Sequence, residues 1–306
     1  MIKKKFEGED PKKIYQERNK DRLHRFLLAD NTVRGFLVRG NRVVKEMKHN
    51  HSLGPLETLI LGQTYLGALL MAANLKDEGR IRLQWECGGP VGGIDVEADN
   101  HGTVRGFLKN VPIPAGEHDG DRFPDLFGAG FLTVTRLTGD FKEPLSSTVM
   151  LKHGRIAEDL TEYYFESEQI NTAMALSVSI NNDGEPDGAG GLFLQALPGA
   201  PEEIITGLEQ ILEKLPSLGG LFASDKDADA LILDLFAAYA PKFLDSGRVE
   251  FFCPCDKNLF AGYLRGLPEK DRMDIAENGP FPLEITCQNC SSKYVFEKSE
   301  LTDLLK

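Results

Sequence analysis

The chain has 306 residues, of which 41% are hydrophobic and 27% are charged, so it is long enough for about two domains and too apolar to be disordered. Its 31 glycines and 16 prolines follow no fixed period, which excludes a fibrous repeat. Its net charge of −12 disfavours nonspecific binding to nucleic acid or to an anionic membrane surface, so we expect neither as a partner.

The N-terminal segment, up to Arg25, is basic, but no apolar stretch of the signal-peptide type follows it. The most apolar segment, residues 53–75, is interrupted by polar side chains and glycines and is too broken for a membrane span. We predict that this segment forms a buried core helix. Without an export signal the protein is expected to be cytoplasmic, where its five cysteines stay reduced and form no disulfide framework.

Residues 32–180 alternate short strand patterns with turns and two helical stretches, which predicts one mixed α/β body. Residues 33–38 and 42–47 flank the sequence Arg39-Gly40-Asn41 and are predicted to form a hairpin. Residues 181–191 are predicted to be a long glycine-rich loop. Further strands are predicted at 81–85, 93–98, 103–108, 131–136, 175–180 and 192–197.

The pattern changes after Pro198. Residues 201–215 carry apolar side chains at helical spacing, and a second amphipathic helix is predicted to begin near Ser224 and to stop at Pro241. Residues 217–222 between them are apolar and contain glycines, so we expect a flexible connection there. Because two short helices need a packing surface to be stable, we predict a helical linker, residues 198–252, that docks on an N-terminal domain, residues 1–197.

Four of the five cysteines lie near the C-terminal end of the chain, in the motifs C-P-C at 253–255 and C-Q-N-C at 287–290. Two close pairs of thiolates supply the four soft ligands that zinc binds in a tetrahedron. The helical segment 259–276 between them has few core residues, so metal binding is expected to contribute on the order of 10 kcal/mol to the folding of a module at 253–306. The predicted ligands of one Zn²⁺ per chain are Cys253, Cys255, Cys287 and Cys290.

The predicted fold class is therefore α+β, with a mixed α/β body, a helical linker and a small C-terminal zinc-binding module. The zinc site has two possible roles. Most four-cysteine zinc sites in small modules are structural. However, a thiolate held by zinc is already deprotonated, so an oxidant that reaches it can convert the cysteines into disulfides and expel the metal.

Several stretches together resemble the heat-shock protein 33 family of redox-regulated chaperonins. The resemblance extends from about Arg22 to Leu301 and includes the two cysteine pairs. The other stretches that carry it are GPVG at 89–92, EAD at 97–99, VRG at 104–106, LTVTR at 132–136, IAEDL at 156–160, YYF at 163–165 and SEQ at 167–169.

The resemblance implies an ATP-independent chaperone, a holdase, which is not an enzyme. The reduced, zinc-bound form would be an inactive monomer. Oxidation would pair Cys253 with Cys255 and Cys287 with Cys290, release zinc, unfold a metastable linker and favour homodimers that hold unfolding client proteins during oxidative stress. We expect clients to contact apolar linker residues, namely Leu208, Ile211, Leu212, Leu231, Ile232, Leu235 and Phe236.

Two other functions remain open from the residues alone. A structural zinc protein would gain no activity on oxidation. A thiol oxidoreductase would need a reactive C-x-x-C beside a thioredoxin-like βαβ unit, whereas residues 287–290 follow a strand-like segment, 282–286, in a small module. A zinc ribbon that binds nucleic acid is disfavoured, because acidic residues outnumber basic residues around the cysteines.

The remaining polar candidates are interpreted as structural. His49 and His51 are expected to be surface histidines, and a carboxylate series, Glu158, Glu162 and Glu166, is expected on a solvated helix face. Residues 88–93 lack the lysine of a phosphate-binding loop and are expected to form a turn.

Three features depart from the family pattern. Cys87 lies beside the glycine-proline turn and is expected to be a small buried hydrophobic side chain. Pro254 stiffens the first cysteine pair and removes a backbone N–H. Residues 118–125 are expected to form an added polar loop.

Overall fold

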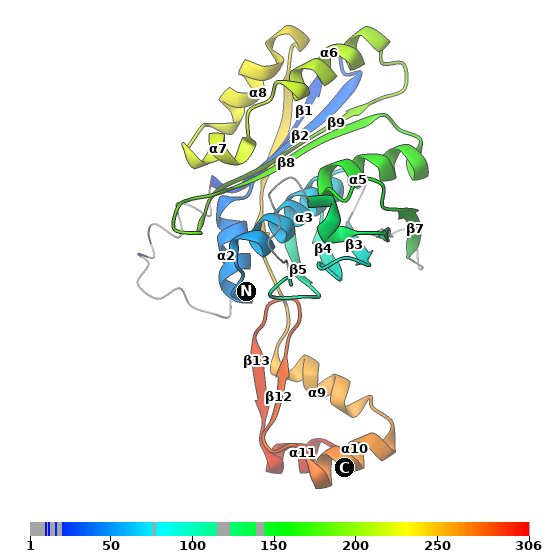
Figure 1. The fold of residues 1–306 in the computed structure, drawn as a ribbon, viewed down its shortest axis with the longest axis vertical. Coiled ribbons are helices and arrows are strands. Elements are labelled where there is room, and N and C mark those ends of the chain that lie inside the picture. Colours follow the sequence, from blue (N-terminus) through cyan, green and yellow to red (C-terminus); the bar gives the residue numbers. More distant parts are fainter. Residues whose placement is uncertain are drawn as a thin grey trace.

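The computed structural model describes residues 10, 12, 16, 20–75, 78–114, 123–138 and 144–305. Most of the basic N-terminal segment and residues 118–122 of the expected polar loop lie outside this described part. Two sheets and two layers of helices form the main body, and a smaller module lies at the C-terminal end (Figure 1).

The first sheet has five strands in the order β10-β1-β2-β9-β8, and the second has six in the order β11-β5-β4-β3-β6-β7. The five-stranded sheet contains β1 (Arg22–Leu28), β2 (Val33–Arg39), β8 (Thr172–Ile180), β9 (Pro186–Ala196) and β10 (Lys242–Arg248). The six-stranded sheet contains β3 (Gly79–Cys87), β4 (Gly93–Asp99), β5 (Thr103–Leu108), β6 (Gly130–Thr138), β7 (Leu145–Met150) and β11 (Glu250–Phe251).

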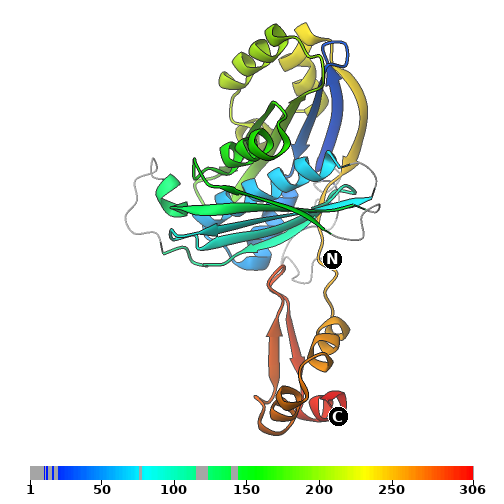
Figure 2. The same cartoon turned by 90° about the vertical axis from the view of Figure 1, so that its right-hand side faces the viewer.

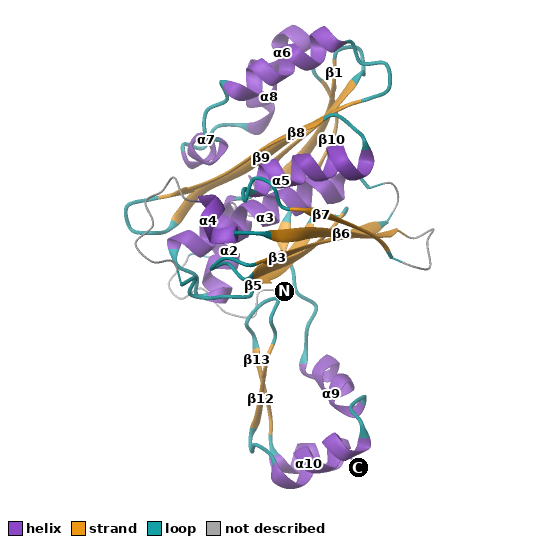
Figure 3. Cartoon of the chain, turned by 45° about the vertical axis from the view of Figure 1, so that its right-hand side comes forward, coloured by secondary structure: helices purple, strands orange, loops and turns teal. Residues whose placement is uncertain are grey.

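Helices lie between the two sheets and also cover the outer face of the five-stranded sheet (Figure 3). The helices of the main body are α2 (Asn41–His51), α3 (Pro55–Ala73), α4 (Phe123–Phe127) and α5 (Ile156–Tyr163), which continues as a π-helix, η1 (Tyr164–Glu168). The outer helices are α6 (Glu202–Glu213), α7 (Leu218–Ala223) and α8 (Ala228–Phe236), which ends in a 3-10 turn, η2 (Ala237–Tyr239).

Helix α3 is the centre of the main core. Proline at its first position suits the helix start, and the helix is apolar on every side. It has the length and hydropathy of a membrane span, but 78% of that window is buried inside the protein, between the two sheets. The prediction of a buried core helix at 53–75 is therefore confirmed.

The strand predictions in the six-stranded sheet are also confirmed. In β3 the side chains of Ile81, Leu83 and Trp85 are buried, whereas Arg80 and Arg82 on the opposite face are exposed. This alternation follows from the two-residue period of a strand that has one face on the core. The turn predicted at 88–93 connects β3 to β4.

The predicted hairpin at 33–47 is wrong, because residues 42–47 belong to helix α2. The apolar residues of this segment suit a helix as well as a strand, so periodicity alone does not decide between them. The helix is favoured by Asp21, whose carboxylate accepts the backbone N–H groups of Arg42 at 2.7 Å and Val43 at 2.9 Å. A buried ion pair between Arg42 and Glu46, one turn apart, supports the same conformation.

The long loop predicted at 181–191 is shorter in the structure, because β9 begins at Pro186. Gly188 and Gly190 lie in this strand, beneath helix α7. A Cβ atom at Gly188 would lie 1.9 Å from the backbone oxygen of Gly219, and one at Gly190 would lie 2.5 Å from the Phe222 ring. These glycines therefore allow close packing of a helix on the strand.

The segment after Pro198 contains the two predicted amphipathic helices, α6 and α8, with two differences. Asp227 caps α8 by accepting the N–H of Ala230 at 2.9 Å, so this helix begins after Asp227 and not near Ser224. Residues 217–222, expected to be a flexible connection, lie largely in helix α7, whose Leu218 and Phe222 are buried. The rest of the segment includes β10 and β11, which join opposite sheets of the main body.

The C-terminal module projects away from the main body (Figure 2). It has a small apolar core of its own, which includes Leu264, Phe296 and Leu301. Its elements are α9 (Lys257–Arg265), α10 (Glu269–Asn278), β12 (Leu283–Thr286), β13 (Lys293–Phe296) and α11 (Lys298–Leu305). The molecule thus has the predicted α+β class, with a four-cysteine cluster where the module meets the body.

Candidate metal centre

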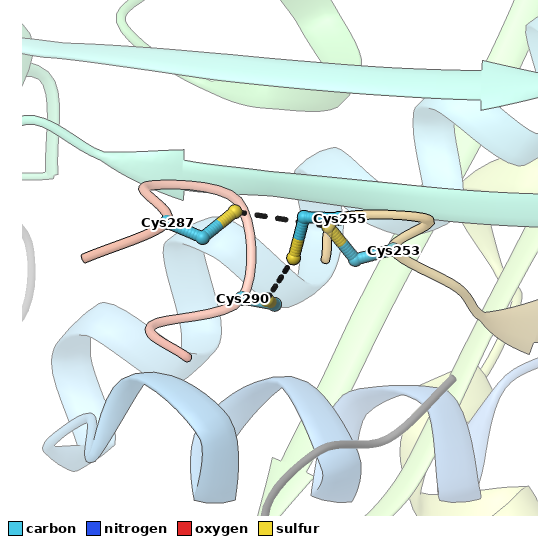
Figure 4. Close-up of side chains that lie close together, drawn as sticks. All are labelled: Cys253, Cys255, Cys287 and Cys290. Atoms are coloured by element: carbon cyan, nitrogen blue, oxygen red, sulfur yellow. Dashed lines mark hydrogen bonds between the residues drawn. The ribbon is translucent and has the colours of Figure 1, made fainter. Parts of the chain in front are cut away.

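The four cysteines predicted as metal ligands come together in one cluster (Figure 4). All four sulfur atoms lie within 4.8 Å of one another, and all four residues are buried. Between the two motifs, the Sγ atoms of Cys253 and Cys287 are 3.8 Å apart and those of Cys255 and Cys290 are 3.3 Å apart. The cluster therefore offers four soft ligand atoms at one point, as a tetrahedral metal site requires.

The first cysteine pair lies between a strand and a helix. Phe252, just before Cys253, donates its N–H to the backbone oxygen of Val104 at 3.1 Å, so the chain enters the cluster attached to strand β5. Just after Cys255, the carboxylate of Asp256 accepts the N–H of Leu259 at 2.7 Å and caps helix α9. Both ends of the C-P-C motif are therefore held by regular structure.

The second cysteine pair lies in a tight turn between β12 and β13. The backbone oxygen of Cys287 accepts the N–H of Ser291 at 2.7 Å, and the N–H of Cys287 donates to the oxygen of Ser292 at 2.9 Å. Ser291 has a positive φ of 53°, which closes the turn. The turn directs the sulfurs of Cys287 and Cys290 toward the first pair (Figure 4).

Polar side chains surround the sulfurs. The hydroxyl of Tyr294 lies 3.2 Å from Cys255 Sγ and donates to the backbone oxygen of Cys255 at 2.9 Å. The hydroxyl of Ser292 lies 3.3 Å from Cys290 Sγ. Groups of this kind orient the ligands of a metal site and adjust their basicity.

The electrostatics of the cluster favour at least one thiolate. Hydrogen bonds from Cys287 and Cys290 hold the pKa of Cys253 well below its usual value, and the guanidinium of Arg105 lies 3.9 Å from Cys253 Sγ. The same contacts raise the pKa of Cys287, because a thiol next to a thiolate ionises with more difficulty. A divalent cation would overcome this repulsion, so the four residues could hold a metal ion.

The sequence reasoning missed His51, which it interpreted as a surface histidine. His51 lies at the end of α2 and is only partly exposed. Its Nε2 atom lies 3.2 Å from the backbone oxygen of Asn289, and its Nδ1 atom lies 3.0 Å from Ser291 Oγ. The imidazole thus contacts the turn that carries Cys287 and Cys290. Because the two segments are far apart in the sequence, no local signal indicates the contact.

The predicted client-contact residues of the linker lie on the inner faces of α6 and α8. In the described structure Leu208, Leu231, Ile232 and Phe236 are buried, whereas Ile211, Leu212 and Leu235 are partly buried. They pack against apolar side chains of the five-stranded sheet, and the rings of Phe236 and Phe26 lie 5.8 Å apart.

Polar contacts also hold the linker to the body. His24 on β1 lies 2.8 Å from Asp229 of α8. Asp225, between α7 and α8, pairs with Lys20 at 2.6 Å and with Arg39 at 2.8 Å. Hydrogen bonds from these two cations lower the pKa of the Asp225 carboxyl.

The remaining candidates lie outside the cluster. Cys87 is half-buried, and burial raises the pKa of its thiol to about 12, so it is not an activated nucleophile. Glu162 and Glu166 both pair with Lys152, and His153 lies between Glu158 and Glu162. This carboxylate series therefore forms ion pairs on the surface of α5 and η1.

Comparisons with known proteins agree with this architecture. The family model described as Hsp33 protein matches residues 21–297. A 33 kDa chaperonin of Desulforamulus reducens is 35% identical over 288 residues, which cover 94% of this chain and 97% of the relative. A 33 kDa chaperonin of Agathobacter rectalis is 33% identical over 290 residues, which cover 93% of this chain and 99% of the relative.

A solved structure shows the same fold. The crystal structure of the 33 kDa chaperonin, a heat shock protein 33 homolog, from Thermotoga maritima matches with a TM-score of 0.84 and 29% identity. The match covers 94% of this chain and 98% of that one. Since the family model and these relatives extend through both sheets, the linker helices and the cysteine cluster, the chain belongs to the Hsp33 protein family.

Proposed function

We propose that this chaperone is a redox-regulated, ATP-independent holdase and not an enzyme, with the four-cysteine cluster as its switch. The observation that carries the proposal is the position of the cluster, at the end of the chain segment that joins the linker to both sheets. β10 pairs with β1, β11 pairs with β5, and Cys253 follows shortly after β11. A change at the cysteines can therefore act directly on the attachment of the linker.

In the reduced state the residues that would hold zinc are the four clustered cysteines. The donor set fits Zn²⁺, because it consists of four buried cysteine sulfurs close enough to share one ion. When bound, zinc supplies folding free energy to the C-terminal module and keeps the thiolates ionised. The small apolar core of the module is consistent with such a dependence.

In the oxidised state Cys253 pairs with Cys255 and Cys287 with Cys290. Each disulfide forms when two thiolates give two electrons to a peroxide, whose O–O bond breaks to give two hydroxide ions. Two such bonds leave no ligand for the metal. Because each disulfide lies within one motif, no covalent bond ties the first motif to the second, and the two halves of the cluster are free to separate.

Separation of the two halves releases the linker, residues 198–252, from the N-terminal domain, residues 1–197. The module at 253–306 then no longer holds β11 and β10 in place. The apolar faces of α6 and α8, and the sheet face beneath them, become available to unfolding client proteins. The same apolar surface favours a homodimer of the oxidised protein, whereas the reduced protein is a monomer. We expect this activation to take place in the cytoplasm during oxidative stress.

The test is zinc release followed with a chromogenic chelator, alongside the aggregation of a heat-unfolding test protein, before and after peroxide with mild warming. We expect one zinc per chain to leave and holdase activity to appear, and both to reverse on reduction with added zinc. A Cys87→Ser variant is the matched control, because it removes a thiol outside the cluster and should respond like the parent protein.

A second candidate function is a purely structural zinc site, and the burial of all four sulfurs favours it. Cys253 is 0% exposed and Cys287 only 6%, which limits the access of an oxidant. If zinc leaves on oxidation and no holdase activity appears, the cluster is a structural site and the proposed switch is wrong.

A further inference from the structure

A pocket of about 790 Å³ lies between the linker helix α6 and the main body, beside the start of β8. One wall is α6, and the other walls come from α5, η1 and strands β8 and β9. Figure 1 shows α6 and α5 on either side of this edge of the five-stranded sheet. Because two separate parts of the molecule build the pocket, a molecule that fills it contacts both.

The interior of the pocket is mainly apolar. Leu208 and Leu212 line it from α6, while Met174 and Leu194 line it from the sheet. Phe165 of η1 also lines it, and this side chain is 65% exposed. An exposed aromatic ring beside an apolar interior favours a ligand with an apolar body, and its face can accept a cation.

The rim of the pocket is acidic. Its lining includes four carboxylates and no lysine or arginine. Glu158 and Glu162 have basic neighbours, Arg155, Lys152 and His153, and His153 also lines the pocket. Within the part of the chain that the structure describes, Glu209 and Glu213 of α6 have no ion-pair partner, although they lie one helical turn apart and repel each other.

Helix α6 is held more weakly than its neighbour. Leu208 is the only residue buried in α6, all of which is described, whereas α8 buries Ala228, Leu231, Ile232 and Phe236. With little buried apolar area, α6 opens at a low free-energy cost. The pocket lies between α6 and the main body, where closer packing of the helix would leave no space.

We propose that this pocket binds a small organic cation, an ammonium or guanidinium group on an apolar body, and that the bound cation holds α6 against the main body. The apolar part contacts the leucines and Phe165, and the cationic group lies between Glu209 and Glu213. Since the pocket exists only while α6 is docked, the ligand binds the docked form alone. It therefore shifts the equilibrium of α6 toward that form.

The consequence for the chaperone rests on the function proposed above. A ligand that holds α6 in place opposes release of the linker, so such a cation would delay activation. Binding and the effect on α6 are properties of the reduced protein and need no oxidation, so they are tested independently of the redox switch.

The first experiment measures binding of 4-phenylbutylammonium to the reduced, zinc-loaded full chain by calorimetry. The matched control is 5-phenylpentanoate, which has a similar apolar body and the opposite charge. We expect the cation to bind at least about tenfold more tightly than the anion, as two nearby carboxylates imply. Equal binding of both probes, or no binding of the cation, overturns the proposal.

Two variants at the pocket and one control variant locate the site. The double variant Glu209→Gln and Glu213→Gln keeps the shape of exposed side chains and should remove the preference for the cation. The double variant Glu269→Gln and Glu277→Gln, on exposed positions of α10, removes the same charge far from the pocket and should bind like the parent chain. Ala173→Leu fills the pocket from β8 and should abolish binding. Unchanged binding in the first variant or in Ala173→Leu overturns the site.

The second experiment measures hydrogen exchange of the α6 amides in the reduced protein. At a cation concentration ten times its Kd, exchange should slow by about tenfold in α6, and amides of α10 should not change. If the cation binds and α6 exchange stays the same, the claim that it holds α6 is wrong. If the cation slows α6 exchange but oxidation produces no holdase activity, the proposed function is wrong and the cation-binding site is still supported.

Discussion

The Nε2 atom of His51 lies 3.2 Å from the backbone oxygen of Asn289, so an imidazole at the end of helix α2 contacts the turn that carries the second cysteine pair. The other ring nitrogen lies 3.0 Å from Ser291 Oγ. At the first cysteine pair, Arg105 of β5 lies 3.9 Å from Cys253 Sγ. The cluster is thus attached to the main body at both cysteine pairs, through side chains as well as through β11.

The first prediction concerns this attachment. Replacing His51 by Ala removes two hydrogen bonds, which should cost about 2 kcal/mol and raise the open fraction of the Cys287–Cys290 turn by roughly thirtyfold. We therefore expect faster transfer of zinc to a chelator in the reduced protein. His101→Ala, in the exposed turn between β4 and β5, is the control and should transfer zinc at the parent rate. Equal rates for both variants would show that His51 does not hold the turn.

The second prediction concerns the coupling of the cluster to the linker. Replacing Cys287 and Cys290 by Ser removes half of the soft ligands, so the module should lose its metal and release the linker without any oxidant. Limited proteolysis should then cut residues 198–252 much faster than in the parent chain. A double variant that stays resistant to the protease in this region would contradict the coupling.

The third prediction concerns the docking of α8. Phe236 is 0% exposed and its ring packs against Phe26, so Phe236→Ala should destabilise the docked helix by about 3–5 kcal/mol. The linker should then open at lower temperature in the reduced state, as followed by hydrogen exchange of α8. Leu233 belongs to the same helix and is 48% exposed, so Leu233→Ala should have almost no effect. Similar exchange in the two variants would count against the packing described here.

The fourth prediction concerns pH. Asp21 is buried, and burial raises the pKa of its carboxyl from 3.8 to about 7, although two backbone N–H groups act in the opposite direction. Between about pH 4 and pH 7 the folded chain keeps a proton that the unfolded chain has lost. The contribution of Asp21 to the free energy of unfolding therefore falls as the pH rises, by up to about 1.4 kcal/mol per pH unit.

Denaturant unfolding at several pH values with excess zinc checks this prediction through the difference between variants. Asp21→Asn keeps an oxygen acceptor for the α2 cap and removes the titration, so this part of the slope should disappear. Asp225 is the control: its pKa lies below its ordinary value of 3.8, so the stability that it contributes is lost only at lower pH. Asp225→Asn should leave the slope between pH 4 and pH 7 unchanged. An unaltered slope in Asp21→Asn would show that Asp21 titrates normally.

Local sequence patterns were sufficient to predict much of the fold. The alternation at Ile81, Leu83 and Trp85 predicted a strand, since one face of β3 lies on the core. The apolar spacing after Pro201 predicted α6, and the apolar segment at 53–75 predicted a buried helix, which the structure has at Pro55–Ala73. The spacing of the four cysteines predicted that their sulfurs meet, because two short motifs suit one tetrahedral site.

The errors occurred where distant residues decide the local conformation. The sequence at 42–47 suits both a strand and a helix, and Asp21, which lies before β1, favours the helix by capping it. The glycines at 188 and 190 resemble those of a loop, and only the approach of α7 shows why a strand carries them. A periodic pattern records which faces are buried and does not identify the partner that covers them.

The amino-acid sequence by itself determined the class of the protein, the position of its core helix and linker helices, and the four clustered cysteines, because these depend on composition, period and short spacings. Only the tertiary structure decided that β10 and β11 join opposite sheets and that the cluster contacts His51 and Arg105. It also decided that a pocket with an acidic rim lies under α6. These features arise from contacts between segments that are far apart in the sequence, and such contacts depend on how the layers pack as a whole.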